Sequence, residues 1–401
     1  MKIKKLTKLL MLVAVTIFVG CDIDELLPRD VEVDGGEGDI ELSCSTASKV
    51  GESRAITHEV LPTHLVPAIG DFSMTMVGNH TNRFEPKAED LKEGETVENI
   101  GTAENPQWKV TCNYAWNKIS EIAGYNEPKV RFNKLKTGRY DSQQGCYLNS
   151  YKIEIKYGET VGEGANVKYA EGFDKPYFKG TSVDASDNEA SFSIKPKQLS
   201  EVNVNAKLMN SCFVVNVTDW MLNYFRDITF DIYTNDNKFT FTQVVTNGVT
   251  TFNCVQSKKV VTVTETDGVQ TEDIKYTKVA EKSGLVLEPA GTVTANDGSV
   301  TENNLLSVNV GDENTPEYKT QHIFINPSQP LKFAFTAKKA QTGTNVQSEL
   351  VEINNNLTAQ YRYKLTIDCE TAGAGNVINV GFNETWVTVE TKNVNLNPDN
   401  K

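Results

Sequence analysis

Apolar and polar residues alternate along many short stretches of the chain, with a period of two. In residues 151–157, YKIEIKY, the tyrosines and isoleucines fall on one face, and the lysines and glutamate fall on the other. Residues 361–369, YRYKLTIDC, and residues 201–208, EVNVNAKL, follow the same rule. Alternation of this kind is typical of strands that bury one face, so we predict a mostly β protein.

Further stretches are predicted to be strands on the same grounds: residues 39–45, 72–78, 191–196, 212–217, 228–234, 238–245, 331–337 and 386–391. Asp267-Gly268 lies between two β-rich runs within residues 258–278, which favours a hairpin with a primed turn. Helical periodicity is limited to residues 114–124 and residues 219–225, and Asp219 is expected to cap the second helix.

Many short strands separated by Gly, Asn and Asp indicate antiparallel β-sandwiches. The folded part, about 360 residues, is large for one sandwich, so we expect two in tandem. Lys195-Pro196-Lys197 interrupts a strand, and we place the boundary after it. The N-terminal β-sandwich domain then covers residues 39–198, and the C-terminal β-sandwich domain covers residues 199–401.

The first 20 residues follow a different pattern. Four lysines precede an apolar run over residues 9–19, which is too short to span a membrane. We therefore predict a signal peptide over residues 1–20. The run leads into Val19-Gly20-Cys21, which resembles the lipobox of bacterial lipoproteins, although Phe18 and Val19 depart from its usual residues. The resemblance implies that Cys21 is lipidated and holds the protein at the outer membrane.

Residues 21–38 are expected to form the lipidated cysteine and an acidic, flexible tether, because they contain many acids, a Gly-Gly pair and no periodicity. The acids after Cys21 resemble a surface-export signal of lipoproteins in anaerobic Gram-negative bacteria, with a plain acidic tether as the alternative. The net charge is −13, and loss of the four lysines with the signal peptide makes it −17. Such a charge gives no electrostatic reason to bind nucleic acid.

Six cysteines remain beside Cys21: Cys44, Cys112, Cys146, Cys212, Cys254 and Cys369. An even number permits many disulfide pairings, and the sequence does not choose among them. Because Cys212 and Cys369 fall within predicted strands, buried free thiols are the favoured interpretation.

The order of motifs in the middle of the chain resembles one protein family. A strand ends in Tyr157-Gly158, the loop Lys175-Pro176-Tyr177-Phe178-x-Gly180 follows, and a long strand pair comes next. Residues 115–122 resemble the short helix before a G-x-Y strand, here Gly138 and Tyr140. This order resembles the fimbrillin-like surface lipoproteins related to type V pili, most specifically over residues 151–235.

The resemblance implies two transthyretin-like antiparallel β-sandwich domains and a role as pilus subunit, anchor or adhesin, not as an enzyme. It also implies donor-strand addition, in which proteolysis removes an N-terminal strand and the groove accepts a strand of another subunit. Residues 38–44 and 386–396 are the candidate groove-forming and donor segments. Arg54 is the candidate processing site, with an ordinary loop arginine as the alternative. The short tail, residues 397–401, favours an anchor, tip or stand-alone adhesin over a shaft subunit.

The sequence contains no HExxH, GxSxG or P-loop motif, so we assign no catalytic, cofactor-binding or metal-binding residue. Residues 184–189, DASDNE, lack the spacing of a calcium loop and are predicted to form a solvated turn. Tyr177 and Phe178 are predicted to plug one end of a sandwich. Trp108 and Trp220 are predicted to pack in cores, with stacking on sugars as the alternative.

The sequence thus predicts a surface-exposed, lipid-anchored protein of the outer membrane that acts in cell adhesion or in assembly of a pilus (fimbria) as anchor, tip or accessory subunit. Its expected partners are other pilus subunits and a host or microbial surface ligand, and no cofactor is expected. The alternative is a glycan-binding lipoprotein of a polysaccharide-uptake system, which would present a flat platform of aromatic side chains.

Overall fold

The structure is a computed structural model. It describes residues 36–45, 61, 65–82, 96–104, 106, 108–116, 130–138, 140–141, 145–266, 269–287, 293–294, 300–301, 305–312, 315–354, 357–360, 362–369, 377–384 and 387–398. The predicted signal peptide, Cys21 and Arg54 lie outside these residues.

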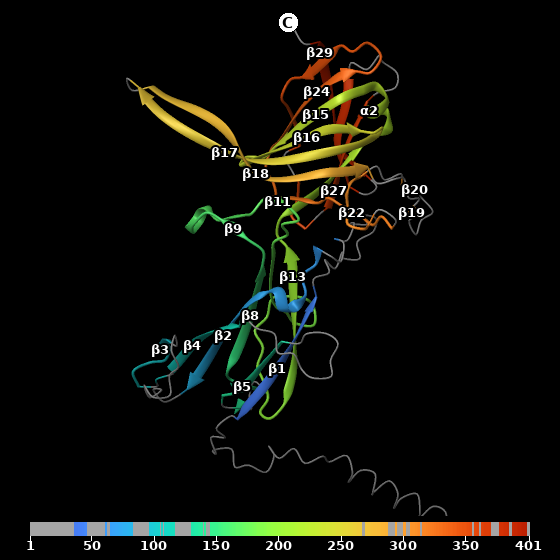
Figure 1. Cartoon of the computed structure of the whole chain (residues 1–401). Helices are drawn as coiled ribbons and strands as arrows, with labels where there is room; N and C mark the ends of the chain where they lie inside the picture. The colour runs from blue at the N-terminus through green and yellow to red at the C-terminus, as the bar shows by residue number, and fades with distance from the viewer. Residues whose placement is uncertain are drawn as a thin grey trace, which may run out of the picture.

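The described chain is almost entirely β-structure and forms two lobes, one above the other (Figure 1). The predicted all-β fold with two tandem units is confirmed. One α-helix occurs among the described residues, α2 (Asp219–Tyr224), in the second lobe. No helix in this part of the chain has the length and apolar character needed to cross a membrane.

The first lobe is one curled sheet of eight strands. Its order is β3 (Thr96–Asn99), β4 (Trp108–Trp116), β2 (Ser73–Asn82), β8 (Ser150–Tyr157), β12 (Phe178–Ser182), β13 (Leu199–Leu208), β1 (Glu37–Ser45) and β5 (Val130–Lys136). All neighbours are antiparallel except β1 and β13, which run parallel. Two short strand pairs are separate: β6 (Tyr140–Asp141) with β7 (Cys146–Tyr147), and β9 (Thr160–Val161) with β10 (Lys168–Tyr169).

The alternation in the sequence explains how this sheet encloses a core. In β8, Tyr151, Ile153 and Ile155 are buried, while the residues between them are half-buried. Side chains two apart on a strand share a face, so each strand contributes one apolar row. Val202 and Val204 of β13 add the next row. The same core includes Cys212 and Phe324, which belong to strands of the second lobe.

The second lobe has two layers joined through its last strand. The strand order is β11 (Gly172–Phe173), β23 (Ile323–Ile325), β14 (Ser211–Val217), β27 (Arg362–Cys369), β28 (Val377–Glu384), β29 (Val387–Pro398), β25 (Asn345–Ser348), β24 (Leu331–Lys339), β15 (Phe225–Tyr233), β16 (Asn237–Thr246), β17 (Val249–Thr266), β18 (Val269–Leu287), β21 (Leu306–Asn309) and β22 (Tyr318–Thr320). β26 (Val351–Asn354) pairs with β24, and β19 (Val293–Thr294) pairs with β20 (Val300–Thr301).

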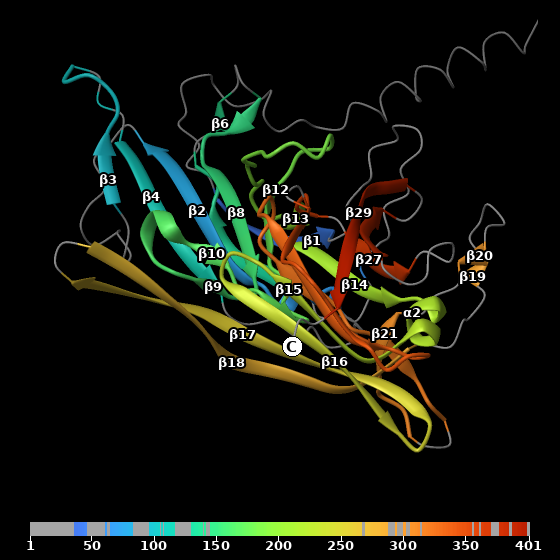
Figure 2. The same ribbon diagram turned by 90° about the horizontal axis from the view of Figure 1, so that it is seen from above.

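Aromatic side chains fill the core of the second lobe. Phe230 stacks on Phe241 with ring centroids 4.6 Å apart, and Phe333 lies 6.1 Å from Phe230 on its other side. The pairing of β17 with β18 confirms the predicted hairpin, although its predicted turn, residues 267–268, lies outside the described residues. The two strands run far out beyond the lobe (Figure 2).

Several sequence predictions are corrected by the structure. Residues 114–116 end β4 instead of starting a helix, and the remainder of that predicted helix lies outside the described residues. Residues 191–196 form only a single bridge, from Phe192 to Tyr151, instead of a strand. The predicted tether ends two residues early, since β1 begins at Glu37.

The start of α2 also differs from the prediction. Thr218, not Asp219, is the N-cap residue, and its side chain does not cap the helix. The Thr218 hydroxyl lies 2.5 Å from Asp368 Oδ1 on β27, so it is engaged with a neighbouring strand.

The pairing of β13 bears on the position of the domain boundary. β13 starts at residue 199 yet pairs with β12 and β1 of the first lobe. Apart from β11, which already pairs with β23, the chain therefore passes to the second lobe at residues 209–210. The division into domains stays a prediction, and we propose that it lies at this crossing.

Candidate functional site

The first strand, β1, lies inside the first sheet with a neighbour on each side. Seven residue pairs align it in parallel with β13, and five align it antiparallel with β5, the edge strand. Ile40 and Leu42 are 0% and 5% exposed and belong to the core of the lobe. The strand therefore fills a groove that has backbone partners on both walls and an apolar floor.

Polar contacts fix β1 along the same groove. Glu41, although almost buried, accepts a hydrogen bond from Arg131 Nη2 of β5 at 2.9 Å and forms an ion pair with it. At the start of the strand, Lys197 N–H donates to Glu37 O at 2.7 Å. Any other residue at position 38 would force the backbone to shift, because a Cβ there would lie 2.3 Å from Lys195 O.

Cys44 ends the row of inward side chains of β1. It is a free thiol and is half-buried, and burial raises its pKa from 9.0 to about 11. Cys212, Cys254 and Cys369 are free and buried, so the prediction of buried free thiols is confirmed for these three. A thiol with a raised pKa reacts slowly, because the thiolate is the nucleophile.

The predicted donor segment near the end of the chain is also engaged. β29 pairs with β28 over most of its length and with β25 at residues 396–398, so it joins the two layers of the second lobe. The other segment predicted to take part in strand exchange is β1. It is followed by residues 46–60, which contain Arg54 and lie outside the described residues.

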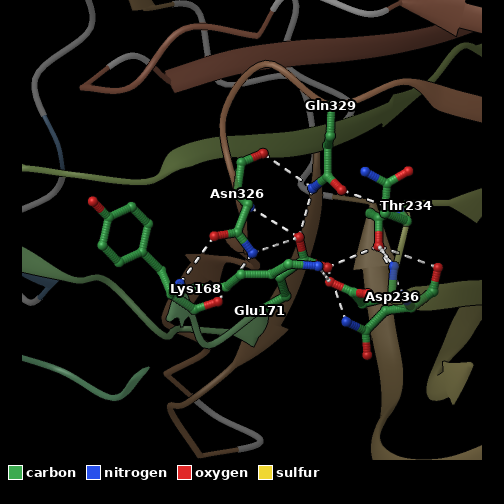
Figure 3. Close-up of polar contacts among 9 residues, drawn as sticks. Lys168, Glu171, Thr234, Asp236, Asn326 and Gln329 are labelled. Carbon is green, nitrogen blue, oxygen red and sulfur yellow. Dashed lines mark hydrogen bonds and ion pairs between the residues drawn. The ribbon is translucent and has the colours of Figure 1, made fainter. Parts of the chain in front are cut away.

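A buried carboxylate, that of Glu171, is the centre of a network of polar contacts (Figure 3). Glu171 precedes β11 and is 8% exposed. Its Oε1 accepts hydrogen bonds from Asn326 N at 2.9 Å, Asn326 Nδ2 at 3.0 Å and Gln329 Nε2 at 2.5 Å. Its Oε2 accepts from Thr234 Oγ1 at 2.8 Å and from Asn237 Nδ2 at 2.9 Å.

The donors of this network come from two turns of the second lobe, β15–β16 and β23–β24. Gln256 Nε2 adds a bond to the Glu171 carbonyl at 3.0 Å. Outside the network, Lys168 forms an ion pair with Asp236 at 2.6 Å (Figure 3). Five neutral donors compensate the cost of burying the charge, so the segment that leaves the first lobe is held in one orientation.

The loop of the family motif packs as predicted. Phe178 is 1% exposed within the core of the first lobe, and Tyr177 stacks on Tyr169 at 4.8 Å. Gly158 has φ +101°, and a Cβ there would lie 2.4 Å from Pro176 O. The turn at Tyr157-Gly158 and the Lys-Pro-Tyr-Phe loop are therefore one packed unit at the end of the lobe.

The two tryptophans differ from each other. Trp108 is half-buried, whereas Trp220 is 48% exposed on α2, so core packing is wrong for Trp220. Tyr224 lies one turn further along the helix, with its ring centroid 6.1 Å from that of Trp220 and the planes at 33°. Tyr224 is half-buried against the core of the second lobe, so the exposed aromatic surface is mainly that of Trp220.

Residues 184–189 form the predicted turn. Asp184 Oδ1 accepts from Ser186 N at 2.8 Å and from Asn188 N at 3.0 Å, and these backbone donors lower its pKa. Glu189 is paired with Lys152 instead, which lowers the pKa of that glutamate. Among the described residues, no group of three or more His, Cys, Asp or Glu side chains is placed to hold a metal ion.

A cleft of about 390 Å³ lies at the seam between the lobes and contains two aspartates, Asp71 and Asp174, among its lining residues. Asp71 Oδ2 accepts from Ala68 N at 3.0 Å, and Asp174 lies 3.6 Å from Lys282. Both carboxylates thus serve local structure. Sequence reasoning missed the Glu171 network, because its members are spread over residues 171–329 and no spacing links them.

Comparison with known proteins gives one family and several distant structures. A protein of Bacteroides eggerthii, provisionally named as a cell adhesion protein, is 12% identical with a TM-score of 0.31, and the match covers 92% of this chain and 97% of that one. The fimbrial anchor protein Mfa2 of Porphyromonas gingivalis is 8% identical with a TM-score of 0.27, covering 89% and 100%.

A third structure, from Bacteroides thetaiotaomicron, is provisionally named as polysaccharide-binding; it is 8% identical with a TM-score of 0.26, covering 86% and 96%. No curated protein matches the chain. The family model described as "Domain of unknown function (DUF4493)" matches residues 125–327, about half of the chain, and the chain belongs to that family.

Proposed function

We propose that this chain is a surface-exposed protein, lipid-anchored in the outer membrane, that acts in adhesion or pilus assembly through exchange of its first strand. The observation that carries the proposal is the position of β1, which is next to the predicted tether, is flanked by strands on both sides and is buried on one face. The names of the similar structures agree with it. Anchor, tip or accessory subunit is the proposed role.

The physical basis is β-augmentation. Removing β1 would expose the edges of β13 and β5 together with the pockets of Ile40 and Leu42. An added strand gains backbone hydrogen bonds from both edges, and its alternate side chains refill the pockets. Cleavage at Arg54 would separate β1 from the rest of the body and so permit the exchange.

Strand exchange can be tested with a labelled peptide of residues 36–45. After trypsin cleavage at Arg54, we expect the peptide to replace β1, whereas the uncut protein and the variant Arg54→Gln should not take it up. A peptide with Ile40→Asp and Leu42→Asp is the matched control, since buried carboxylates cannot refill the pockets. Equal uptake of both peptides, or none by the cut protein, would contradict the proposal.

The lipid anchor is tested separately. We expect Cys21→Ser to release the protein from membrane fractions, because the acyl chains provide the membrane affinity. Cys44→Ser is the control, since Cys44 lies within β1 and should leave the protein bound. Retention of the Cys21→Ser protein in membranes would show that the anchor is assigned wrongly.

Glycan binding is the second candidate, because Trp220 is exposed on α2 beside the half-buried ring of Tyr224. A glycan array with the whole protein is the test. Binding that Trp220→Ala abolishes and that Trp108→Ala leaves intact would favour this function, and an array without hits would remove it.

A further inference from the structure

The outer half of the β17–β18 hairpin stands clear of the second lobe (Figures 1 and 2). The pairing of β17 with β16 ends at Lys258, and from there to Thr266 its strand partner is β18. We call residues 259–279 the arm. Its described side chains are exposed on both faces except for the half-buried Lys259. A two-stranded ribbon is marginally stable in water, so a further strand beside the arm would stabilise it.

The apolar strip of the arm is not a continuation of the core. Within the lobe, β17 buries Phe252 and Cys254, and side chains of the same parity share that face. In the arm, Val261 and Val263 have the other parity and lie on the opposite face, where Val261 pairs with Ile274, whereas Val260 keeps the parity of the core face. The strip consists of Val261 (43% exposed), Val263 (54%), Ile274 (47%) and Tyr276 (37%).

The outer edge of β18 is available along the arm. β18 pairs with β21 at residues 286–287, and no other described strand pairs with this edge. Lys259 N–H donates to Asp236 O, on the side away from β18. Its cross-strand partner Tyr276 therefore directs its backbone groups away from β17, and with a period of two so does Ile274.

We propose that two copies of this chain join edge to edge through β18, antiparallel, with Ile274 of each copy at the two-fold axis. In this register Asp273 lies opposite Lys275 of the other copy, and Thr271 lies opposite Thr277 of the other copy. Symmetry makes each contact occur twice. The two apolar strips then form one surface across four strands. This self-association goes beyond the proposed exchange of β1 and is independent of it.

The charges on the arm are what identify a second copy as the occupant. Only residues whose backbone groups point outward can pair across this edge, so the neighbouring registers place the axis two residues away, at position 272 or 276. At position 272 two glutamates would face each other, and at position 276 Lys275 would face Thr277 without an ion pair. Like charges directly opposite on neighbouring strands are destabilising, whereas opposite charges and Thr–Thr pairs are favourable. The register centred on Ile274 therefore avoids the repulsion between glutamates and makes two ion pairs, which a chance edge would not be expected to do.

Charge exchange between copies is the test. The full chain is studied in detergent by sedimentation over a range of concentrations, where the unmodified chain should form dimers. Asp273→Lys alone and Lys275→Asp alone should lose the dimer, because each places like charges opposite each other twice. An equimolar mixture of the two variants should recover it, because each lysine again faces an aspartate. Recovery cannot come from repair of the Lys275–Asp273 ion pair within one chain, since each variant still lacks it.

Cross-linking tests the register. Ile274→Cys should give a disulfide-linked dimer under oxidation, because opposed residues on antiparallel strands lie about 5.5 Å apart between Cα atoms. Thr271→Cys should not, since its copies would be about 20 Å apart, but mixed with Thr277→Cys it should. Val249→Lys, on an equally exposed valine at the other end of the hairpin, should leave the dimer intact. A chain that stays monomeric, or a mixture that fails to recover the dimer, overturns the proposal.

Discussion

Glu171 shows how one buried carboxylate can hold a segment of the chain against the turns of the second lobe. Its carboxylate takes five hydrogen bonds from neutral groups, and all the partners are buried or nearly so. Removing the acceptor leaves these donors without compensation for their lost hydration.

We therefore predict that Glu171→Ala lowers the free energy of unfolding by on the order of 3 kcal/mol. Chemical denaturation of the whole chain measures the change. Glu159→Ala is the matched control, because Glu159 is an exposed glutamate of the same segment with an ion pair to Lys175. Its loss should be within about 0.5 kcal/mol. Equal effects of the two variants would show that the network is not a determinant of stability.

Cys44 reports on whether β1 is in its groove. With its pKa raised to about 11 by burial, its thiolate fraction at pH 8 is about a hundredfold below that of a thiol with the ordinary value of 9.0. Stability linked to this thiol is present below pH 9 and falls as pH rises from 9 to 11, because the unfolded chain loses its proton first. We expect slow alkylation in the intact protein and faster alkylation once β1 is displaced, measured by mass spectrometry of the peptide. An unchanged rate after displacement would contradict this expectation.

At the scale of elements, β1 contributes alternate side chains to the core of the first lobe. Leu42→Ala removes a buried side chain between two neighbouring strands, so we predict a loss of about 2–5 kcal/mol in stability. Hydrogen exchange should rise in β1, β5 and β13. Ser43→Ala, on the exposed face of the same strand, should change little. Faster exchange confined to β29 would show that the groove does not depend on Leu42.

The sequence was informative about strands and less so about their partners. Alternation predicted β8, β13 and β27 because each of them buries one face. It did not predict that β1 pairs in parallel with β13, since a strand 160 positions away leaves no local signal. The Glu171 network could not be predicted for the same reason, because its donors come from turns that only the folded chain brings together.

At the scale of the whole molecule, the two lobes share core residues. Phe324 of β23 and Cys212 of β14 belong to strands of the second lobe but pack in the core of the first. We predict that Phe324→Ala raises hydrogen exchange in both lobes, in β8 as well as in β24. Phe335→Ala, a phenylalanine within the second core, should affect the second lobe first. Exchange that rises in one lobe only for both variants would show that the lobes unfold separately.

The parallel pairing of β1 with β13 has a mechanical consequence. A pull on the chain ahead of Glu37 acts along the strand axis, so the hydrogen bonds to β13 and β5 are loaded together in shear. Peeling from one end would break them one at a time, at a lower force. If the protein is anchored through this segment, a pulling force on the cell would be resisted for as long as β1 stays paired with both neighbouring strands.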